Sequence, residues 1–519
     1  MQEIDHKTEQ KTFVLDTSVL TFSPYAFLAF DEHRVIIPVA VIEELNNKAQ
    51  FGGEEGANAR TALRALERTC GYHGSGLCRG HERYETQDGG TVEIIDELYC
   101  RKSNIAMGDM EKRFWWNKNE AVFRVIKTAA LFTKTSDPLS ENSYFGDKDA
   151  KPTNVVHLVT KNLTQRLIAR DIAGISAEDL RSAQIEDGRK QYAGRCTVYV
   201  TNDELNSFAQ KGFLELGAGE RYYLPEGAGT DSITDYNLTI NEFCILRSNS
   251  SSMLGRYDGK KIVKLKYDNT MPMDIKPRNV GQRFALEALL APASEAPLVI
   301  LKGPAGTAKT FLAMAAGLQQ TYNTQNPAYK RILCSRPAVK FDDEIGFLSG
   351  DENSKIGPLM RPIFDNIENL MPNAEKNKGA TEEFNPKNPG YIESNSPARY
   401  LMDKGVVVTQ AMAFMRGRSV CDTFIFIDEC QNSSPNQVLG LITRPGEGSK
   451  IVLVGDPEQI DNPEFDKRSN GLSVASEKMK GSPFCWQVTF NEHECTRSAL
   501  AQDAIMRMSD KGADRFFGK

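Results

Sequence analysis

The segment that most constrains the fold lies at residues 297–318, where an apolar strand, a glycine-containing turn and a helical stretch follow one another directly. The strand is PLVILK, the turn is GPAGTA, and the helical stretch begins with Lys309 and Thr310. A strand that enters a helix through so short a turn is typical of an α/β unit with a parallel sheet. The turn directs backbone N–H groups and a helix N-terminus at one point, which predicts an anion-binding site.

The same residues nearly match the phosphate-binding pattern GxxxxGK[ST]. In that pattern the loop N–H groups face the β-phosphate, the lysine adds a point charge and the hydroxyl holds Mg²⁺. The candidate ATP-binding residues of the loop are Gly303, Pro304, Ala305, Gly306, Thr307, Ala308, Lys309 and Thr310. Ala308 replaces the second glycine of the pattern, and we expect it to keep a negative, helical φ as the first helical residue. The alternative is a chance glycine-rich turn.

Two later strands end in polar residues that suit a nucleotide site. The stretch 423–429 (TFIFIDE) delivers Asp428, which would hold Mg²⁺ through water, and Glu429, which would orient and deprotonate the attacking water. The stretch 450–461 (KIVLVGDPEQID) delivers Asp456 as a Mg²⁺ support and Gln459 as a sensor of the γ-phosphate. For the first stretch the alternative is a pair of acids that merely end a strand. For the second it is a turn of solvated polar residues.

Two further side chains are candidates for nucleotide contacts. Gln282 precedes the loop by about 20 residues and is a candidate to read the adenine edge, with a surface helix residue as the alternative. Arg497 is a candidate to contact the γ-phosphate, and a solvated helix arginine fits the sequence equally well.

The chain separates into three regions by pattern. Strands alternate with helical stretches in the first region and again in the third, which favours parallel α/β sheets. The strands of the third region are nearly continuous apolar runs, as expected for a sheet that is buried on both faces. Between them the pattern changes to short strands separated by Gly, Ser and Asn, which indicates a small β-rich connector.

Composition excludes several classes of protein. The 519 residues carry 63 Lys and Arg against 69 Asp and Glu, a net charge of -6, which argues against a wholly basic nucleic-acid binder but leaves room for a local basic groove. Ten cysteines in this length do not suggest a disulfide scaffold. The first dozen residues are polar and the chain contains no long apolar run, so we expect no signal peptide, no membrane span and a cytoplasmic location.

A second set of acidic residues lies near the N-terminus. Asp16 ends the run FVLD, Glu43 and Glu44 lie in a helical stretch after a second strand, and Glu120 falls in the first turn of a later helix. Carboxylates that converge at strand ends suit Mg²⁺ or Mn²⁺, which would activate water for phosphodiester cleavage. For Glu43, Glu44 and Glu120 the alternative is an ordinary solvated helix charge.

Two neighbouring features could also bind ligands. Cys70, His73, Cys78 and His81 form a C-x2-H-x4-C-x2-H pattern that could hold Zn²⁺, with a plain glycine-rich loop as the alternative. The segment 101–134 carries eight Lys and Arg, three acids and several aromatic residues, which could guide single-stranded RNA. Alternatively its aromatic residues belong to a core, an interpretation that suits Phe123 and Phe132 best.

The C-terminal motifs together resemble the PhoH family of ATPases, whose nucleotide domain is related to the motors of superfamily 1 helicases. The resemblance spans about residues 275–508 and includes KPRNVGQRFALEALL, SRPAVKFDDEIGFLSGD, KIGPLMRPIFDNIENL, FMRGRS, FIFIDECQNSSPNQV, LITRPGEGSKIVLVGDPEQID and SNGLSVASEKMKG. It implies ATP hydrolysis in a homo-oligomer, a hexameric ring being one form, in which an arginine of one subunit reaches the nucleotide of its neighbour. Arg497, Arg444 and Arg336 are the positions to test for that role.

Residues 12–180 resemble PIN-domain ribonucleases through VLDTSVL, IIPVAVIEEL and LVTKNLTQRLIARDIAGISAEDL. The family places its second acid directly before a leucine, which selects Glu44 beside Asp16. Its third acid, usually Asp, is Glu120 here, and its fourth is replaced by Asn162, so one carboxylate charge is missing.

The resemblances imply an α/β architecture of three parts: a PIN-like parallel-sheet domain at 12–185, a β-rich connector at 186–274 and a RecA-like P-loop NTPase domain at 275–519. The expected function is ATP-dependent RNA processing that combines a helicase-like motor with a metal-dependent endoribonuclease. The first alternative is an RNA-binding ATPase switch or scaffold with an inactive PIN domain, which Asn162 favours. The second is an ATPase that acts on small phosphorylated metabolites.

Overall fold

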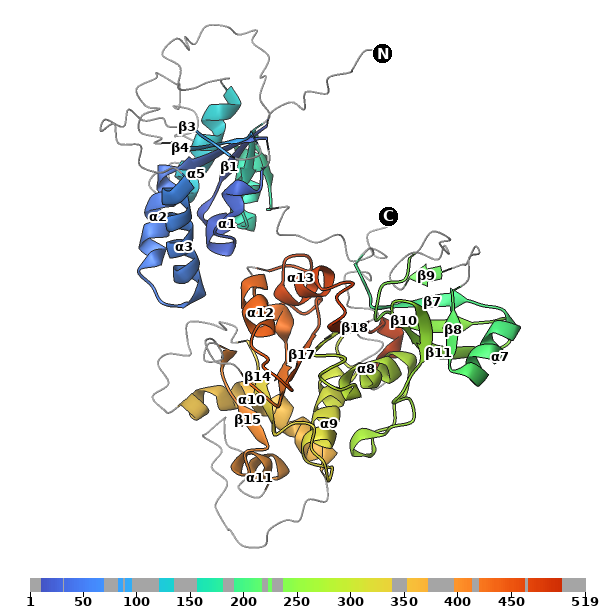
Figure 1. Ribbon diagram of the computed structural model, residues 1–519. Helices are drawn as coiled ribbons and strands as arrows, with labels where there is room; N and C mark the ends of the chain where they lie inside the picture. The colour runs from blue at the N-terminus through green and yellow to red at the C-terminus, as the bar shows by residue number, and fades with distance from the viewer. Residues whose placement is uncertain are drawn as a thin grey trace, which may run out of the picture. The chain divides into compact units, whose positions relative to one another are not determined.

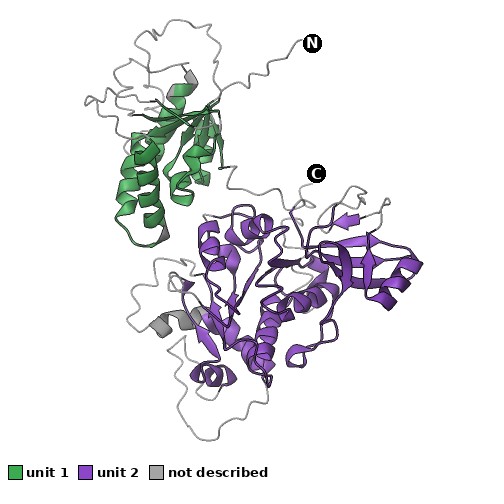
Figure 2. Cartoon of the chain, viewed as in Figure 1, with its two compact units in different colours: residues 1–184 green, residues 185–519 purple. Residues whose placement is uncertain are grey.

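The computed structural model divides the chain into two units, residues 1–184 and 185–519 (Figures 1 and 2), which we treat separately. The structure describes residues 11–30, 32–69, 83–86, 89–95, 121–134, 156–180, 191–216, 223–225, 237–337, 352–371, 396–412, 420–462 and 465–496. Unit 2 contains both the β-rich segment and the C-terminal α/β segment.

Unit 1 is built on a six-stranded sheet of order β3-β4-β2-β1-β5-β6, in which only the β3–β4 pair is antiparallel. The strands are β1 Thr12–Leu15, β2 Arg34–Pro38, β3 Arg83–Glu85, β4 Thr91–Ile95, β5 Val156–Val159 and β6 Ser176–Glu178. The helices are α1 Thr17–Phe22, α2 Val39–Ala49, α3 Gly53–Thr69, α5 Ala121–Lys134 and α6 Leu163–Leu167, with short turns at Ala26–Leu28 and Ile168–Ile172. The central strands β1 and β2 are buried throughout, so their apolar runs form the middle of one core.

The β-rich segment of unit 2 forms a second six-stranded sheet, of order β8-β12-β11-β10-β7-β9. Its strands are β7 Arg195–Tyr199, β8 Phe213–Glu215, β9 Tyr223–Pro225, β10 Phe243–Arg247, β11 Ser252–Tyr257 and β12 Lys261–Lys264, and α7 spans Asn202–Lys211. Only β7 and β10 pair in parallel. Leu205 and Phe208 of α7 share a small core with the sheet.

The third sheet is parallel throughout, of order β15-β14-β16-β17-β13-β18. Its strands are β13 Leu298–Lys302, β14 Arg331–Ser335, β15 Val407–Thr409, β16 Thr423–Ile427, β17 Lys450–Gly455 and β18 Cys485–Thr489. Its helices are α8 Val280–Leu290, α9 Lys309–Thr321, α10 Glu352–Leu370, α11 Pro397–Asp403, α12 Pro435–Ile442 and α13 Gly471–Lys478, with 3₁₀ turns at Pro272–Asp274, Cys430–Asn432 and Glu492–Glu494. This sheet and that of unit 1 confirm the predicted α/β class.

Helices cover both faces of the third sheet (Figure 1). On one face α8, α9 and α10 pack over alternate strand residues, and on the other α12 and α13 do so. The prediction of strands buried on both faces is therefore confirmed, because each strand supplies residues to two separate cores. Among the described residues no helix is long and apolar enough to cross a bilayer.

The β-rich sheet packs against the third sheet within unit 2. Phe243 of β10 stacks on Phe284 of α8 with ring centroids 4.8 Å apart, and the Arg256 guanidinium lies 3.9 Å from the centre of the Trp486 ring. Gly194 leaves no room for a side chain, since a Cβ there would lie 2.1 Å from the Gln487 carbonyl oxygen. The chain just before β7 therefore runs in close contact with β18.

The C-terminal end of α8 is closed by a buried lysine. The Lys450 ammonium donates to the carbonyls of Ala288, Leu289 and Ala291 at 2.9, 3.0 and 2.5 Å, which supplies donors to the last turn of the helix. Burial lowers the pKa of Lys450 to about 7, because the charged form is poorly solvated there.

This burial predicts a pH-dependent contribution to stability. An unfolded chain binds a proton at Lys450 up to its ordinary pKa near 10.5, whereas the folded chain releases it near 7, so between these values folding is favoured as the pH rises. The destabilisation caused by Lys450→Met should therefore grow from pH 7 to pH 9.5, by up to about 1.4 kcal/mol per pH unit, in denaturant unfolding of the full chain. Lys260→Met, at an exposed position, should show no such trend. If the loss of unfolding free energy had the same pH dependence in both variants, the prediction would be wrong.

Candidate functional site

Three neighbouring strands of the third sheet end at the same edge and carry the predicted nucleotide residues. The loop at 303–310 follows β13, Asp428 and Glu429 follow β16, and Asp456 follows β17. The strands are adjacent in the order β16-β17-β13, so the sequence-predicted segments come together. The carboxyl edge of such a sheet is where α/β proteins bind ligands.

The loop depends on glycine where its backbone turns. Gly303 has φ 140°, and a Cβ there would lie 2.7 Å from the Phe490 carbonyl oxygen. Gly306 has φ 85°. Lys309 reaches back over the turn and donates to the carbonyls of Gly303 and Pro304 at 2.7 and 2.8 Å, which places its positive charge inside the loop. Glycine is required at position 303 because a side chain there would collide with Phe490, the residue that follows β18.

Ala308 departs from its predicted conformation. It has φ 68° and ψ 23° and caps α9, whose first residue is Lys309, so the expected negative φ is wrong. The left-handed backbone explains why the pattern has glycine here: a residue with a Cβ adopts this conformation at a cost of about 1–2 kcal/mol. The loop accepts that cost because the Ala308 carbonyl, in this orientation, accepts the Leu312 N–H and starts the helix.

Thr310 and Asp428, predicted as the Mg²⁺ residues, lie in direct contact. The Thr310 hydroxyl donates to Asp428 Oδ1 at 3.0 Å, and Asp428 is 4 % exposed. Burial, reinforced by the neighbouring Glu429 charge, raises the pKa of Asp428 to about 6, while Arg336 and the Thr310 hydrogen bond oppose the shift. A buried carboxylate beside a hydroxyl offers the hard oxygen donors that Mg²⁺ prefers.

Glu429 is held in a left-handed conformation, with φ 52°, at the start of the turn after β16. Its carboxylate lies 3.3 Å from the Arg336 guanidinium and accepts a hydrogen bond of 2.6 Å from the Gln431 amide. Arg336, considered for a role at a neighbouring subunit, thus lies beside the Glu429 of its own chain. Arg444 donates to the Gly440 carbonyl within α12, and Arg497 lies outside the described residues.

Gln431 is a site residue that the sequence reasoning missed. It is fully buried, and its amide nitrogen donates both to Glu429 and to the Gln459 carbonyl. Its amide oxygen accepts the Asp456 N–H at 3.1 Å, so one side chain connects the ends of β16 and β17. The adjacent Gly455 makes room for it, since a Cβ there would lie 2.2 Å from Gln431 Oε1. Its position two residues after the Asp–Glu pair was the available signal.

The remaining predicted nucleotide residues occupy distinct places around the loop. Asp456 binds the loop itself, because its carboxylate accepts the Ala305 N–H at 2.9 Å, and burial raises its pKa. The Gln459 side chain is exposed. Gln282 is only 3 % exposed and donates to the Thr307 carbonyl at 3.3 Å, so the alternative of a surface helix residue is wrong.

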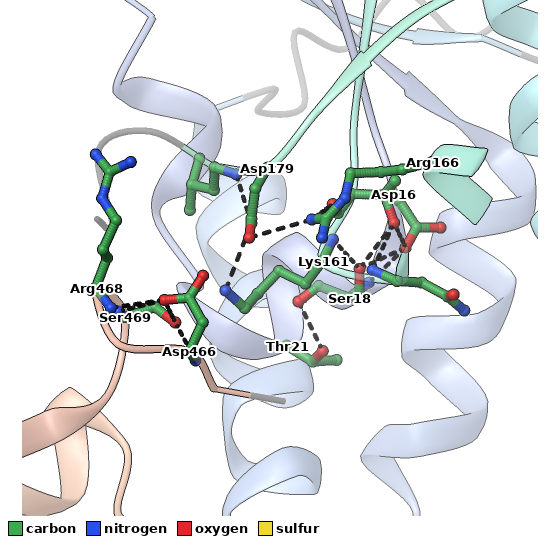
Figure 3. A network of polar contacts seen from close by, with 12 residues as sticks. Asp16, Ser18, Thr21, Lys161, Arg166, Asp179, Asp466, Arg468 and Ser469 are labelled. Atoms are coloured by element: carbon green, nitrogen blue, oxygen red, sulfur yellow. Dashed lines mark hydrogen bonds and ion pairs between the residues drawn. The ribbon is translucent and has the colours of Figure 1, made fainter. Parts of the chain in front are cut away.

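In unit 1, Asp16 follows β1 and caps α1. The Ser18 N–H and hydroxyl donate to its Oδ2 atom at 3.1 and 2.6 Å (Figure 3). The Thr160 hydroxyl donates to the same atom at 3.0 Å. The carboxylate is 4 % exposed, so its orientation is fixed by neighbours from both ends of the unit's sequence. Three donors thus hold one oxygen of this carboxylate in place.

The two candidate glutamates of α2 differ in their surroundings. Glu44 is half-buried and accepts a hydrogen bond of 2.6 Å from Thr17, the residue next to Asp16, whereas the exposed Glu43 pairs with Arg124. Glu44 is thus hydrogen-bonded to the residue that follows Asp16, whereas Glu43 is paired with a residue of α5. Glu120 lies outside the described residues, and within the described ranges no three His, Cys, Asp or Glu residues are grouped to hold a metal.

Asn162 serves a local structural purpose. Its side-chain oxygen accepts the Gln165 N–H at 3.2 Å and so caps α6. Beside it, Asp179 lies between Arg166 at 3.1 Å and Lys161 at 3.5 Å (Figure 3), three residues that the sequence reasoning did not single out. The ion pairs of Asp179 with Lys161 and Arg166 therefore lie close to Asp16, because the Lys161 N–H donates to Ser18, which in turn binds Asp16.

Two sequence predictions fall mainly outside the described residues. Cys70, His73, Cys78 and His81 do so entirely, as does most of the basic and aromatic segment 101–134. Within that segment Phe123 and Phe132 are 6 % and 3 % exposed and belong to the core of unit 1, which confirms the alternative interpretation for these two rings.

The strained backbone at Ala308 predicts an unusual response to glycine. Ala308→Gly should leave the free energy of unfolding unchanged or raise it by up to about 1 kcal/mol, because relief of the left-handed strain offsets the greater freedom of the unfolded chain. The same change at Ala209, which is exposed on α7, should cost about 1 kcal/mol through lost helix propensity. Denaturant unfolding of both variants measures the contrast, and equal losses would contradict it.

Comparison with known proteins agrees with this two-part arrangement. The PhoH-like protein family matches residues 274–509, and the PIN domain family matches residues 13–181. Protein PhoH2 of Bacillus subtilis is 33 % identical over 506 residues, covering 95 % of this chain and 98 % of the relative. Protein PhoH2 of Thermobispora bispora is 29 % identical over 496 residues, with 95 % of each chain covered. The chain therefore belongs to the PhoH2 family, and it joins a PIN domain to a PhoH-like domain.

Proposed function

We propose that this protein is an ATP-dependent RNA-processing enzyme in which the PhoH-like domain hydrolyses ATP and the PIN domain cleaves RNA. The family matches support a hydrolase that combines an ATPase-like part with a nuclease-like part. The observation that carries the ATPase half is the contact of 3.0 Å between Thr310 and the buried Asp428, directly beside the Lys309 loop. Hydroxyl, carboxylate and ammonium groups come together there as a Mg²⁺–triphosphate ligand requires.

The described side chains suggest how hydrolysis would proceed. The loop N–H groups and Lys309 would hold the phosphates, and Thr310 and Asp428 would hold Mg²⁺, which neutralises phosphate charge when bound. Glu429 would accept a proton from water while the water oxygen bonds to the γ-phosphorus and the bond to ADP breaks. Its contacts with Gln431 and Arg336 keep the carboxylate in one orientation, which favours this use as a base.

Other nucleotide contacts belong to the same proposal. Gln282 would read the adenine edge, and Gln459 and Arg497 would respond to the γ-phosphate. A homo-oligomer, such as a hexameric ring, would let Arg497 or Arg444 reach the nucleotide of a neighbouring subunit. The role of an arginine at a neighbouring subunit follows from the family resemblance. The buried position of Gln282 against the Thr307 carbonyl supports its nearness to the nucleotide.

For the PIN domain, Asp16, Glu44 and Glu120 would hold Mg²⁺ or Mn²⁺ for cleavage of single-stranded RNA. Thr17, which follows Asp16 in sequence, donates to Glu44, and the two carboxylates supply the hard oxygen donors that these ions prefer. The second candidate function is an ATPase switch or scaffold whose PIN domain only binds RNA. It is favoured by Asn162, which supplies a neutral amide where the PIN pattern has a carboxylate.

Two variants test the ATPase half of the proposal in the full chain. Lys309→Ala should abolish ATP turnover, because the phosphates lose their buried positive charge. Glu429→Gln should still bind ATP but lower kcat by at least about 100-fold, because the amide cannot accept the proton. Glu458→Gln, which neutralises an exposed acid two residues after Asp456, should leave turnover unchanged. Phosphate release assays give kcat, and rapid hydrolysis by Glu429→Gln would refute its assignment as the base.

Two further variants separate the nuclease from the scaffold. If the PIN domain cleaves, Asp16→Asn should abolish Mn²⁺-dependent cleavage of a single-stranded RNA by the full chain. Asn162→Asp should tighten Mn²⁺ binding several-fold, because it restores a carboxylate while keeping the oxygen that caps α6. Glu43→Gln is the matched control, since Glu43 pairs with Arg124 at the surface. Wild type that binds RNA without metal-dependent cleavage would favour the scaffold.

A further inference from the structure

A buried ion pair joins two parts of unit 2 that lie far apart in sequence. Arg195, the first residue of β7, donates to both carboxylate oxygens of Glu494, at 3.0 and 2.9 Å. Arg195 is 2 % exposed and Glu494 is 9 % exposed. Because burial of two charges costs several kcal/mol, such a pair persists only where further hydrogen bonds compensate for the lost water.

Glu494 receives that compensation from helix α8. The Gly281 N–H, in the first turn of α8, donates to Glu494 Oε1 at 2.7 Å, and the positive end of the helix favours the carboxylate. A Cβ at Gly281 would lie 2.6 Å from Glu494 Oε2, so only glycine lets the carboxylate approach. The Asn491 N–H, just before the 3₁₀ turn that contains Glu494, donates to Glu494 Oε2 at 2.9 Å.

The two residues after Glu494, and one residue of α8, contact the loop after β13. The N–H and hydroxyl of Thr496 donate to the Gly306 carbonyl at 2.9 and 3.1 Å, and the Cys495 thiol approaches the Ala305 carbonyl at 3.7 Å. On the helix side, Gln282 follows Gly281 and donates to the Thr307 carbonyl. Two separate segments that Glu494 holds together therefore bind three successive carbonyls of the loop.

We propose that Glu494, held by Arg195, is a positioning residue for nucleotide binding: it sets the conformation of the loop at 305–307 and links that conformation to the β-rich sheet. The inference rests on the proposed function in one respect, namely that the ligand of the loop is ATP. The residues next to Glu494 and Gly281 contact the loop, and their described contacts do not include Asp428 or Glu429, which follow another strand. A change at Glu494 should therefore weaken ATP binding much more than it slows the chemical step.

The first test compares two buried Arg–Glu pairs, each joined by two hydrogen bonds. Glu494→Gln keeps an acceptor for Gly281 but removes the charge that fixes Arg195, and it should raise the Kd and KM for ATP about tenfold with kcat changed by less than about threefold. Glu93→Gln is the matched control, since Glu93 binds Arg34 through two bonds of 2.8 and 2.6 Å inside unit 1. It also leaves a buried arginine without its charged partner, and it should leave the Kd for ATP unchanged. Calorimetry of the full chain with ATP and Mg²⁺ measures Kd, and phosphate release gives KM and kcat.

The second test uses glycines, so that it does not depend on whether Glu494→Gln folds. Gly281→Ala and Gly440→Ala each add a methyl group within a helix, which by itself raises helix propensity. A Cβ at Gly440 meets nothing within 4 Å, whereas one at Gly281 meets the Glu494 carboxylate. Gly281→Ala should therefore raise the Kd for ATP about tenfold by displacing Glu494, while Gly440→Ala should leave it within about twofold of wild type.

The outcomes distinguish the inference from the function on which it rests. Weakened binding in Glu494→Gln and Gly281→Ala, with normal binding in both controls, supports the positioning role. Wild-type affinity in these two variants, in a protein that binds ATP and loses it in Lys309→Ala, overturns the inference and leaves the proposed function standing. Absence of ATP binding by the wild type overturns both. A loss confined to kcat would assign Glu494 to the chemical step and overturn the positioning role.

Discussion

The turn between β13 and α9 folds back so that the Lys309 ammonium binds the Gly303 and Pro304 carbonyls, and it does so through left-handed backbone conformations. Gly303 and Gly306 adopt positive φ without strain, and Ala308 adopts it with strain. Gly303 lies against Phe490, so a side chain at position 303 would displace the loop from its present position. The positions of Lys309 and Thr310, and hence their relation to Asp428, follow from that geometry.

A second constraint is that the ends of three strands must be connected by polar contacts in a buried setting. Gln431 does this between β16 and β17, and Asp456 does it between β17 and the loop after β13. Each buried donor or acceptor that lacked its partner would cost about 1–3 kcal/mol of stability, so the loss of one contact would destabilise the position of the next. The acidic pocket of unit 1 follows the same rule, since three donors fix the Asp16 carboxylate.

Much of the architecture could be predicted because apolar strands and the loop pattern are local in sequence. The α/β class, the burial of the third sheet on both faces and the meeting of Thr310 with Asp428 follow from such patterns. The sign of φ at Ala308 could not be predicted, because a residue type restricts the backbone without determining it. For Gln282 the sequence left burial and exposure open, and Gln431 was missed, since an amide is usually exposed and becomes buried only when tertiary contacts satisfy it. The Arg195–Glu494 pair spans 299 residues, a separation that no local pattern encodes.

The ion pair also has a mechanical consequence within unit 2. Arg195 begins β7 of the β-rich sheet, and its partner Glu494 immediately precedes the two residues that contact the loop after β13. A displacement of β7 would therefore be passed to the carbonyls of Ala305 and Gly306 through one buried anchor. The β-rich sheet is thus a lever attached to the loop at a single point.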